Sequence, residues 1–160
     1  MTQQFPVPEY RIVYRKSGAY LAAAIIMERS AIIDHELYWA PASSLDEARY
    51  LSAILNSSVL TMAVRPMQAR GEHNPRHFDK YVFRLPIPQY DPDDASHARL
   101  VVLAERSENV AAQAMTTVLA RSGDLELLVA EVGDELEGAA EGGDVAVQDV
   151  LSGDVAVFDL

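Results

Sequence analysis

The chain has 160 residues, a formal net charge of −11 and no cysteine. Without cysteine, disulfides, thiolate zinc sites and cysteine nucleophiles are excluded. No apolar run approaches the ~20 residues that a membrane helix needs, and the N-terminus lacks the basic-then-apolar order of a signal peptide. We therefore expect a cytoplasmic protein with no membrane partner, large enough for one domain and a tail.

The negative charge is concentrated at the end of the chain. All 13 Lys and Arg precede residue 122, together with 13 Asp and Glu, whereas the remainder contains 11 acids and no base. This division predicts a domain over residues 1–122 and a flexible acidic Gly/Val/Asp-rich tail over residues 123–160. The pentapeptide Gly-Asp-Val-Ala-Val occurs at 143–147 and 153–157, which leaves an edge hairpin as the alternative for the tail.

The first part of the chain has the pattern of short strands. Residues 5–16 alternate between apolar and polar side chains and are rich in β-branched residues, which predicts a strand. Residues 21–40 predict two or three further strands, broken near Arg29 and Asp34. The alanines at 22–24 leave a helix as the alternative for the first of these.

Two helices are predicted next. Ser44 followed by Glu47 forms a capping box, in which each side chain bonds an exposed amide of the first turn. Apolar residues then recur at helical spacing up to Asn56. Ser57 can cap a second helix, which Pro66 would end.

The pattern changes again after residue 66. Residues 67–78 are typical of a loop, and residues 80–85 alternate as in a strand. Asp91 with Pro92 is expected to start a long helix that ends near Arg121. The elements together predict a single α/β (α+β) domain with a mixed sheet, a helical pair and a long C-terminal helix.

Basic residues gather around the predicted loop. Between Arg65 and Arg84 there are five bases and two acids, a net charge of +3. Such a local patch can meet phosphates, although a solvated surface loop is the alternative. The candidate DNA-binding residues are Arg65, Gln68, Arg70, Asn74, Arg76, His77, Lys80 and Arg84.

Three segments of the chain form a recognisable series. They are Ile33-Asp34-His35-Glu36-Leu37-Tyr38-Trp39, Glu47-Ala48-Arg49-Tyr50-Leu51-Ser52-Ala53-Ile54-Leu55-Asn56-Ser57, and Gln68-Ala69-Arg70-Gly71 through Arg76-His77-Phe78-Asp79-Lys80 to Leu85-Pro86-Ile87-Pro88. Together they resemble the C-terminal specificity region of Taq-type adenine DNA methyltransferases and related restriction-modification enzymes. Their order and spacing also resemble the recognition domains of type I specificity subunits, over roughly residues 10–120.

The resemblance implies an α/β module that docks on double-stranded DNA beside a methyltransferase catalytic domain or subunit. That domain needs a glycine-rich loop for S-adenosylmethionine and an Asn/Asp-Pro-Pro-aromatic clamp for the flipped adenine. Asn74-Pro75-Arg76 lacks the second proline and the aromatic residue. We therefore expect no catalytic residue and no cofactor in this chain, with S-adenosylmethionine held by the partner.

Other readings of the same residues remain open. His73 and His77 are spaced like a helical metal pair, but Pro75 lies between them, so no metal site is predicted. Phe78, Tyr81 and Phe83 could stack on a base, although core positions are favoured for Tyr81 and Phe83, which share a face of the predicted strand. The alternative function is an acidic protein-interaction or DNA-mimic protein, in which the domain is only a scaffold.

Overall fold

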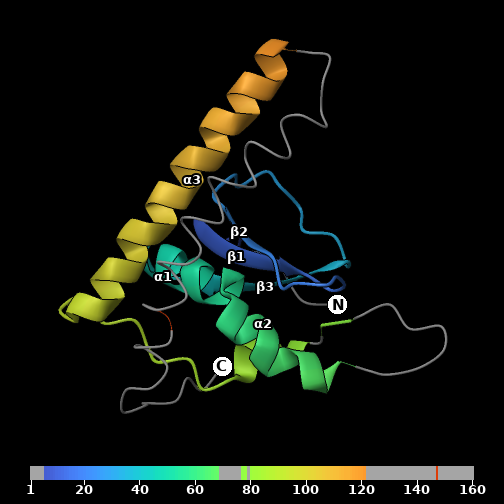
Figure 1. Cartoon of the computed structure of the whole chain (residues 1–160), viewed down its shortest axis with the longest axis vertical. Helices are drawn as coiled ribbons and strands as arrows, with labels where there is room; N and C mark the ends of the chain where they lie inside the picture. Colours follow the sequence, from blue (N-terminus) through green and yellow to red (C-terminus); the bar gives the residue numbers. More distant parts are fainter. Residues whose placement is uncertain (1–5, 69–76, 79, 122–146, 148–160) are drawn as a thin grey trace.

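The computed structural model describes residues 6–68, 77, 78, 80–121 and 147 (Figure 1). These ranges contain a sheet, a helical pair and a long third helix, so the predicted α/β fold is confirmed. Helix α1 packs against the sheet and against α3. The tail predicted over residues 123–160 lies outside the described residues, apart from Val147.

The sheet has the strand order β2-β1-β3, and both strand pairs are antiparallel. Strand β1 spans Tyr10–Arg15, β2 spans Ala23–Ile26 and β3 spans Leu37–Ala42. The strands predicted in this region are confirmed. The helix considered for residues 22–24 is wrong, because β2 begins at Ala23 and pairs with β1.

The outer edge of β2 is contacted by Asn56, the last residue of α1. The Asn56 side-chain oxygen accepts a hydrogen bond from the Ala23 N–H at 2.9 Å, and its amide nitrogen donates to the Ala23 carbonyl at 3.1 Å. One side-chain amide thus bonds both backbone groups of a strand residue, because it carries a donor and an acceptor side by side.

The start of α1 (Leu45–Asn56) follows the predicted capping box with one change. The Ser44 hydroxyl accepts from the Glu47 N–H at 3.1 Å. The Glu47 carboxylate accepts from the N–H of Ser43 at 2.6 Å, one residue before the cap. The Glu47 carboxylate therefore holds Ser43, the residue before the cap, in place at the start of α1.

Ser57 joins α1 to α2 (Ser58–Val64) as predicted. Its hydroxyl donates to the Ile54 carbonyl at 2.7 Å and accepts from the Leu60 N–H at 3.1 Å. Because one buried side chain ends the first helix and caps the second, the two helices are held in a fixed relation.

Two short 3₁₀-helices, η1 (Arg65–Met67) and η2 (Lys80–Arg84), lie on either side of residues 69–76. The strand predicted over residues 80–85 is wrong. Pro86 and Pro88, which follow it, supply no N–H for a strand ladder. The tighter helix instead places Val82 in the core with no exposed surface.

Helix α3 (Ala95–Arg121) begins later than predicted. Asp91 is not its cap, because it forms the preceding turn by accepting from the Asp94 N–H at 3.3 Å. Asp94 occupies the cap instead: its carbonyl accepts from Ala98 at 3.0 Å and its carboxylate from the Ser96 N–H at 2.7 Å. The helix ends at the predicted Arg121.

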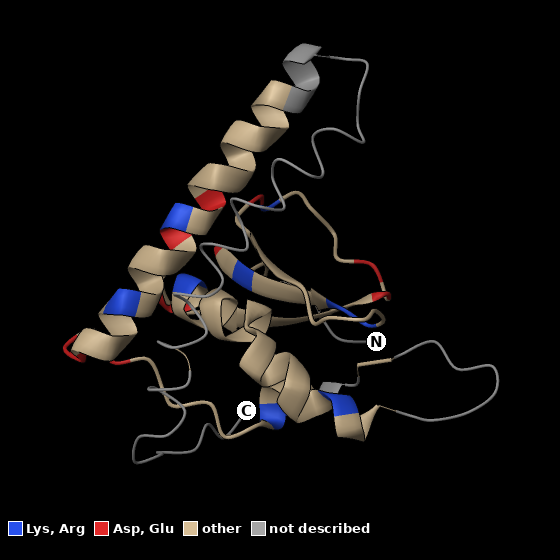
Figure 2. Ribbon diagram, viewed as in Figure 1, with Lys and Arg blue, Asp and Glu red and all other residues tan. Residues whose placement is uncertain are grey.

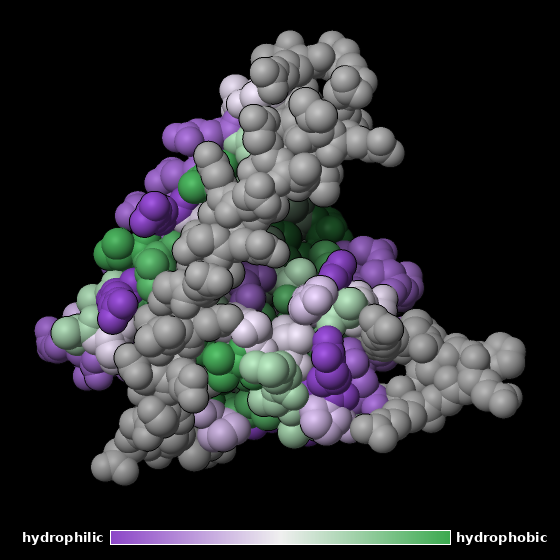
Figure 3. All heavy atoms as spheres, in the orientation of Figure 1, coloured by the Kyte–Doolittle hydropathy of each residue, from purple (hydrophilic) through white to green (hydrophobic). Residues whose placement is uncertain are grey.

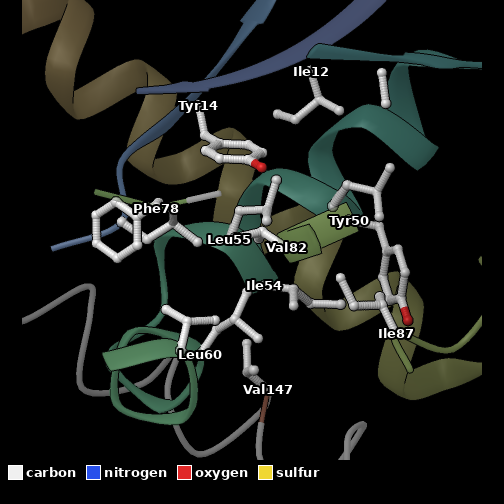
Figure 4. Close-up of a cluster of buried hydrophobic side chains, with 14 of the residues drawn as sticks. Ile12, Tyr14, Tyr50, Ile54, Leu55, Leu60, Phe78, Val82, Ile87 and Val147 are labelled. Carbon is white, nitrogen blue, oxygen red and sulfur yellow. The ribbon is translucent and has the colours of Figure 1, made fainter. Parts of the chain in front are cut away.

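The hydrophobic core lies between the sheet and the helices (Figure 4). Ile12 and Tyr14 of β1 face Leu55 of α1 and Val82 of η2. Tyr50 is also fully buried, and its hydroxyl donates to the Pro88 carbonyl at 2.9 Å. The core thus ties the first strand to a segment about seventy residues later in the chain.

Val147 belongs to the same core. It is 0% exposed and lies in one cluster with Ile54 of α1 and Leu60 of α2 (Figure 4). A valine shielded from water in this way stabilises the fold by roughly 1.5–3 kcal/mol. At least this one residue from the region predicted as a tail therefore contributes to the domain.

Arg11 of β1 is buried, with 1% of its surface exposed. Its guanidinium donates to the carbonyl of Ala31 at 2.8 Å and to that of Glu28 at 2.5 Å, while Nε is buried with no hydrogen-bond partner. These bonds hold the connection between β2 and β3 against the sheet. The buried Nε without a partner reduces the net contribution of these hydrogen bonds to the stability of the fold by roughly 1–3 kcal/mol.

Candidate nucleic-acid interface

The predicted DNA-binding residues lie between Arg65 of η1 and Arg84 of η2 in the sequence. Arg70, Asn74 and Arg76 lie outside the described residues. Gln68 and His77 are the described residues nearest to the gap on its two sides. The structure therefore defines the segments on either side of residues 69–76. We call these segments, α2 with η1 and residues 77, 78 and 80–84, the framework.

Helix α2 and η1 form the first side of this framework. Leu60 and Val64 are buried, and the buried Thr61 hydroxyl accepts a hydrogen bond from the Leu21 N–H at 3.2 Å. Arg65 follows directly, is exposed, and starts η1. The guanidinium is thus presented to solvent from a segment whose backbone is fixed by the core.

The second side pairs with the end of β1. The Phe78 N–H donates to the Lys16 carbonyl, and Ser17 and His77 form an antiparallel bridge. Phe78 is 2% exposed and lies in the core, whereas His77 is exposed. Residues 77 and 78 therefore fix the returning chain in register with a strand about sixty residues earlier.

The aromatic residues of this region serve the core. Phe78 is buried, and the ring of Phe83 packs edge-on against Tyr14 with centroids 4.9 Å apart. Phe83 is only partly exposed, so neither ring offers the open face that a base-stacking platform needs. The side chain of Tyr81 lies outside the described residues, so the prediction for it is untested.

Two further predicted residues lie on η2. Arg84 ends this helix and is exposed, and Lys80 begins it, although the Lys80 side chain is not described. Figure 2 shows basic positions on the short helical segments at the lower edge of the molecule, acidic positions before β3, and both basic and acidic positions along α3. Arg65, His77 and Arg84 make no ion pair with any described carboxylate, in contrast to Arg49, whose guanidinium lies 2.9 Å from Glu105 and 3.2 Å from Glu108.

Exposed methionines lie close in sequence to Arg65. Met62 on α2 and Met67 on η1 are 60% and 51% exposed and flank Arg65 in sequence. In Figure 3 apolar groups at the lower edge of the molecule adjoin hydrophilic ones. A surface that combines cations with accessible apolar side chains can contact both the phosphates and the apolar parts of a nucleic acid.

Two cations near this framework, Arg15 and Lys16, were not among the predicted site residues. Arg15 is the last residue of β1, and Lys16 directly precedes Ser17, the residue that pairs with His77. Sequence reasoning missed them because the pairing joins segments about sixty residues apart. The signal that could have found them is two adjacent cations at the end of a predicted strand and beside a glycine turn.

Acidic residues mark one border of this region. Asp34 and Glu36 lie before β3, with their carboxylates 3.0 and 2.9 Å from the two ring nitrogens of His35. A hydrogen bond from the Glu36 N–H and contacts with His35 lower the pKa of Asp34 below 3.8. This carboxylate is therefore ionised at neutral pH and repels an anion that approaches from its side.

The described residues were also searched for metal-binding groups and for membrane-spanning helices. The described residues contain no group of three or more His, Asp or Glu side chains placed to hold a metal ion. Among the same residues, no helix combines the length and the apolarity needed to cross a bilayer.

Comparisons with known proteins add no assignment. No family model matches the sequence, and no curated protein or solved structure matches it. The resemblance to the recognition regions of adenine DNA methyltransferases thus stays a prediction that rests on the three sequence segments.

Proposed function

We propose that this chain is a recognition module for double-stranded DNA that supports adenine-specific DNA methylation in a restriction-modification system. A methyltransferase catalytic domain or subunit would hold S-adenosylmethionine and carry out the methyl transfer. The proposal rests on the resemblance of three segments, in their order, to the specificity regions of such enzymes. The observation that carries it is the exposed basic framework around residues 69–76.

The geometry of this framework suits sequence recognition. The predicted loop includes Arg70, Asn74 and Arg76, and the eight residues between Gln68 and His77 belong to it. Loops carried on rigid ends commonly provide binding residues, because the scaffold sets their position. Arginine can bond guanine through two donors, and asparagine can bond adenine through a donor and an acceptor.

The exposed residues on either side of residues 69–76 have a different role in this proposal. Arg65, His77 and Arg84 are exposed on backbone that the core fixes. Contacts to phosphates set the orientation of a protein on a duplex, and contacts to base edges supply the specificity. The framework would therefore orient the module while the loop reads the bases.

Salt-dependent DNA binding tests this proposal directly. The full chain is titrated into a labelled duplex of mixed sequence between about 50 and 200 mM salt, where phosphate contacts weaken binding steeply. The variant Arg70→Ala/Arg76→Ala/Lys80→Ala should bind more weakly, with the slope of log affinity against log salt reduced by roughly 0.9 per lost contact. The control Arg29→Ala/Arg99→Ala/Arg106→Ala removes the same charge from exposed positions elsewhere and should keep the slope.

The outcomes distinguish the two functional hypotheses, a DNA-recognition module and an acidic interaction or DNA-mimic protein. Absence of salt-dependent DNA binding by the wild-type chain would overturn the proposal and favour the acidic interaction or DNA-mimic protein. Equal slopes for both triple variants and the wild type would place the DNA-binding surface outside the loop. Melting curves of each variant establish that the fold is retained.

A further inference from the structure

The turn between β1 and β2 carries an aromatic ring that is open to water. Tyr20 is 63% exposed, whereas every other aromatic side chain in the described part of the chain is buried or half-buried. Tyrosine combines a large apolar ring with few rotatable bonds, so an open ring of this kind is well suited to contact a ligand. The rings of Phe78 and Phe83 have no such open face.

The backbone on both sides of this ring is fixed. The next residue, Leu21, is 3% exposed, and its N–H donates to the Thr61 hydroxyl of α2 at 3.2 Å. The Tyr20 carbonyl accepts from the Arg15 guanidinium at 3.1 Å. Because the core and this arginine hold the turn, a contact made by the ring costs little backbone entropy.

Two cations belong to the same turn. Arg15 is exposed, and a Cβ at Gly18 would lie 2.6 Å from its guanidinium carbon, so glycine leaves room for the arginine to fold back toward Tyr20. The Lys16 ammonium lies 5.2 Å from the centroid of the Tyr38 ring, within cation–π range. Neither cation forms an ion pair with a carboxylate of the described residues, so both charges can attract an anion.

An open aromatic ring beside cations is the combination that binds unpaired nucleotides. Any base can stack on such a ring through its π-face, while the cations contact the phosphates on either side. In a duplex the faces of the bases are covered by their neighbours, so a surface ring can reach one only where the strand is unpaired. Two adjacent cations also suit the repeated phosphates of a strand.

We propose that residues 15–21 form a binding site for an unpaired DNA strand, in which Tyr20 stacks on a base and Arg15 and Lys16 contact the flanking phosphates. The site goes beyond the duplex recognition proposed above. Its turn is joined to both sides of the framework, through the bond from Leu21 to α2 and through the bridge between Ser17 and His77.

The test titrates the full chain into a labelled oligothymidylate of about 15 nucleotides, a length that covers a typical single-strand site. Tyr20→Ala should raise Kd by about 5- to 150-fold, the range expected for the loss of one stacked base. Tyr20→Phe keeps the ring and should bind like the wild type, whereas Tyr20→Leu should bind as weakly as Tyr20→Ala. Arg15→Gln should lower the slope of log affinity against log salt by roughly 0.7, the value per phosphate of a single strand.

The control Ile32→Ala truncates an equally exposed apolar side chain on the connection between β2 and β3 and should leave Kd unchanged. Equal Kd values for the wild type, Tyr20→Ala and Tyr20→Leu would overturn the inference, as would a wild-type chain that does not bind the oligonucleotide. If Tyr20→Ala melts below the wild type, Tyr20→Phe and Tyr20→Leu provide the decision, because both keep an apolar side chain. A duplex of mixed sequence titrated in parallel tests the proposed function separately, since failure to bind it leaves the single-strand result unaffected.

Discussion

Val147 provides the most direct test of how far the domain extends along the chain. The side chain is 0% exposed and shares a cluster with Ile54 and Leu60, so Val147→Ala removes two buried methyl groups. Each buried methyl-sized group contributes about 0.8 kcal/mol, and the space left behind adds to the loss. We expect the free energy of unfolding to fall by about 2 kcal/mol.

Thermal melting followed by far-UV circular dichroism measures this change. For a chain of this size 1 kcal/mol corresponds to roughly 2–4 °C, so Tm should fall by about 4–8 °C. The control Val102→Ala makes the same change on α3 at a side chain that is 63% exposed, and its Tm should stay within about a degree of the wild type. Equal Tm values for both variants would refute the assignment of Val147 to the core.

Two further predictions concern the ends of the domain. Removing residues 123–160 changes the formal charge from −11 to 0 and should strengthen DNA binding at low salt, where screening is weakest; because it also removes Val147, the truncated chain should melt below the full chain, and unchanged affinity at low salt would contradict the electrostatic part. At the start of α3, hydrogen bonds from Ser96 lower the pKa of Asp94 below 3.8, so this stabilisation is present above that pH and is lost as the pH falls below it. Asp94→Asn should therefore flatten the acid limb of stability against pH in urea titrations, and an acid limb as steep as that of the wild type would contradict this expectation.

The parts of the fold that could be predicted from the sequence are those set by neighbouring residues. The caps at Ser44 and Ser57 depend on groups within four positions, and both were located correctly. The start of α3 was harder, because Asp91 and Asp94 are equally good caps by residue type. In the structure the Asp91 N–H donates to Nδ1 of the buried His97 at 3.0 Å, and the turn that follows places Asp94 at the cap.

The error at residues 80–85 has a similar cause. A six-residue alternation fits a strand, but a strand also needs a partner edge, and none can be read from the sequence. Residues 77 and 78 already pair with the end of β1, after which the chain turns as a 3₁₀-helix and buries Val82. Tertiary contacts therefore override the local pattern.

In the candidate site, too, residues that are close in sequence could be predicted and residues brought together by long-range contacts could not. The cations of the loop were visible in the sequence because they are close together in it. Arg15 and Lys16 were not recognised because only the bridge between Ser17 and His77 brings the end of β1 to the segment that carries His77. Contacts between distant segments are the information that a single sequence lacks.

The hydrogen bonds of Asn56 to Ala23 have a consequence for self-association. An exposed strand edge offers its N–H and carbonyl groups to a strand of another molecule, which is how many aggregates begin. The Asn56 amide already occupies both groups of Ala23 on the β2 edge, and on β3, the opposite edge strand, Pro41 has no N–H to donate. Each edge strand therefore has one residue whose backbone groups cannot both pair with a strand of another molecule, which disfavours edge-to-edge growth of the sheet at these positions.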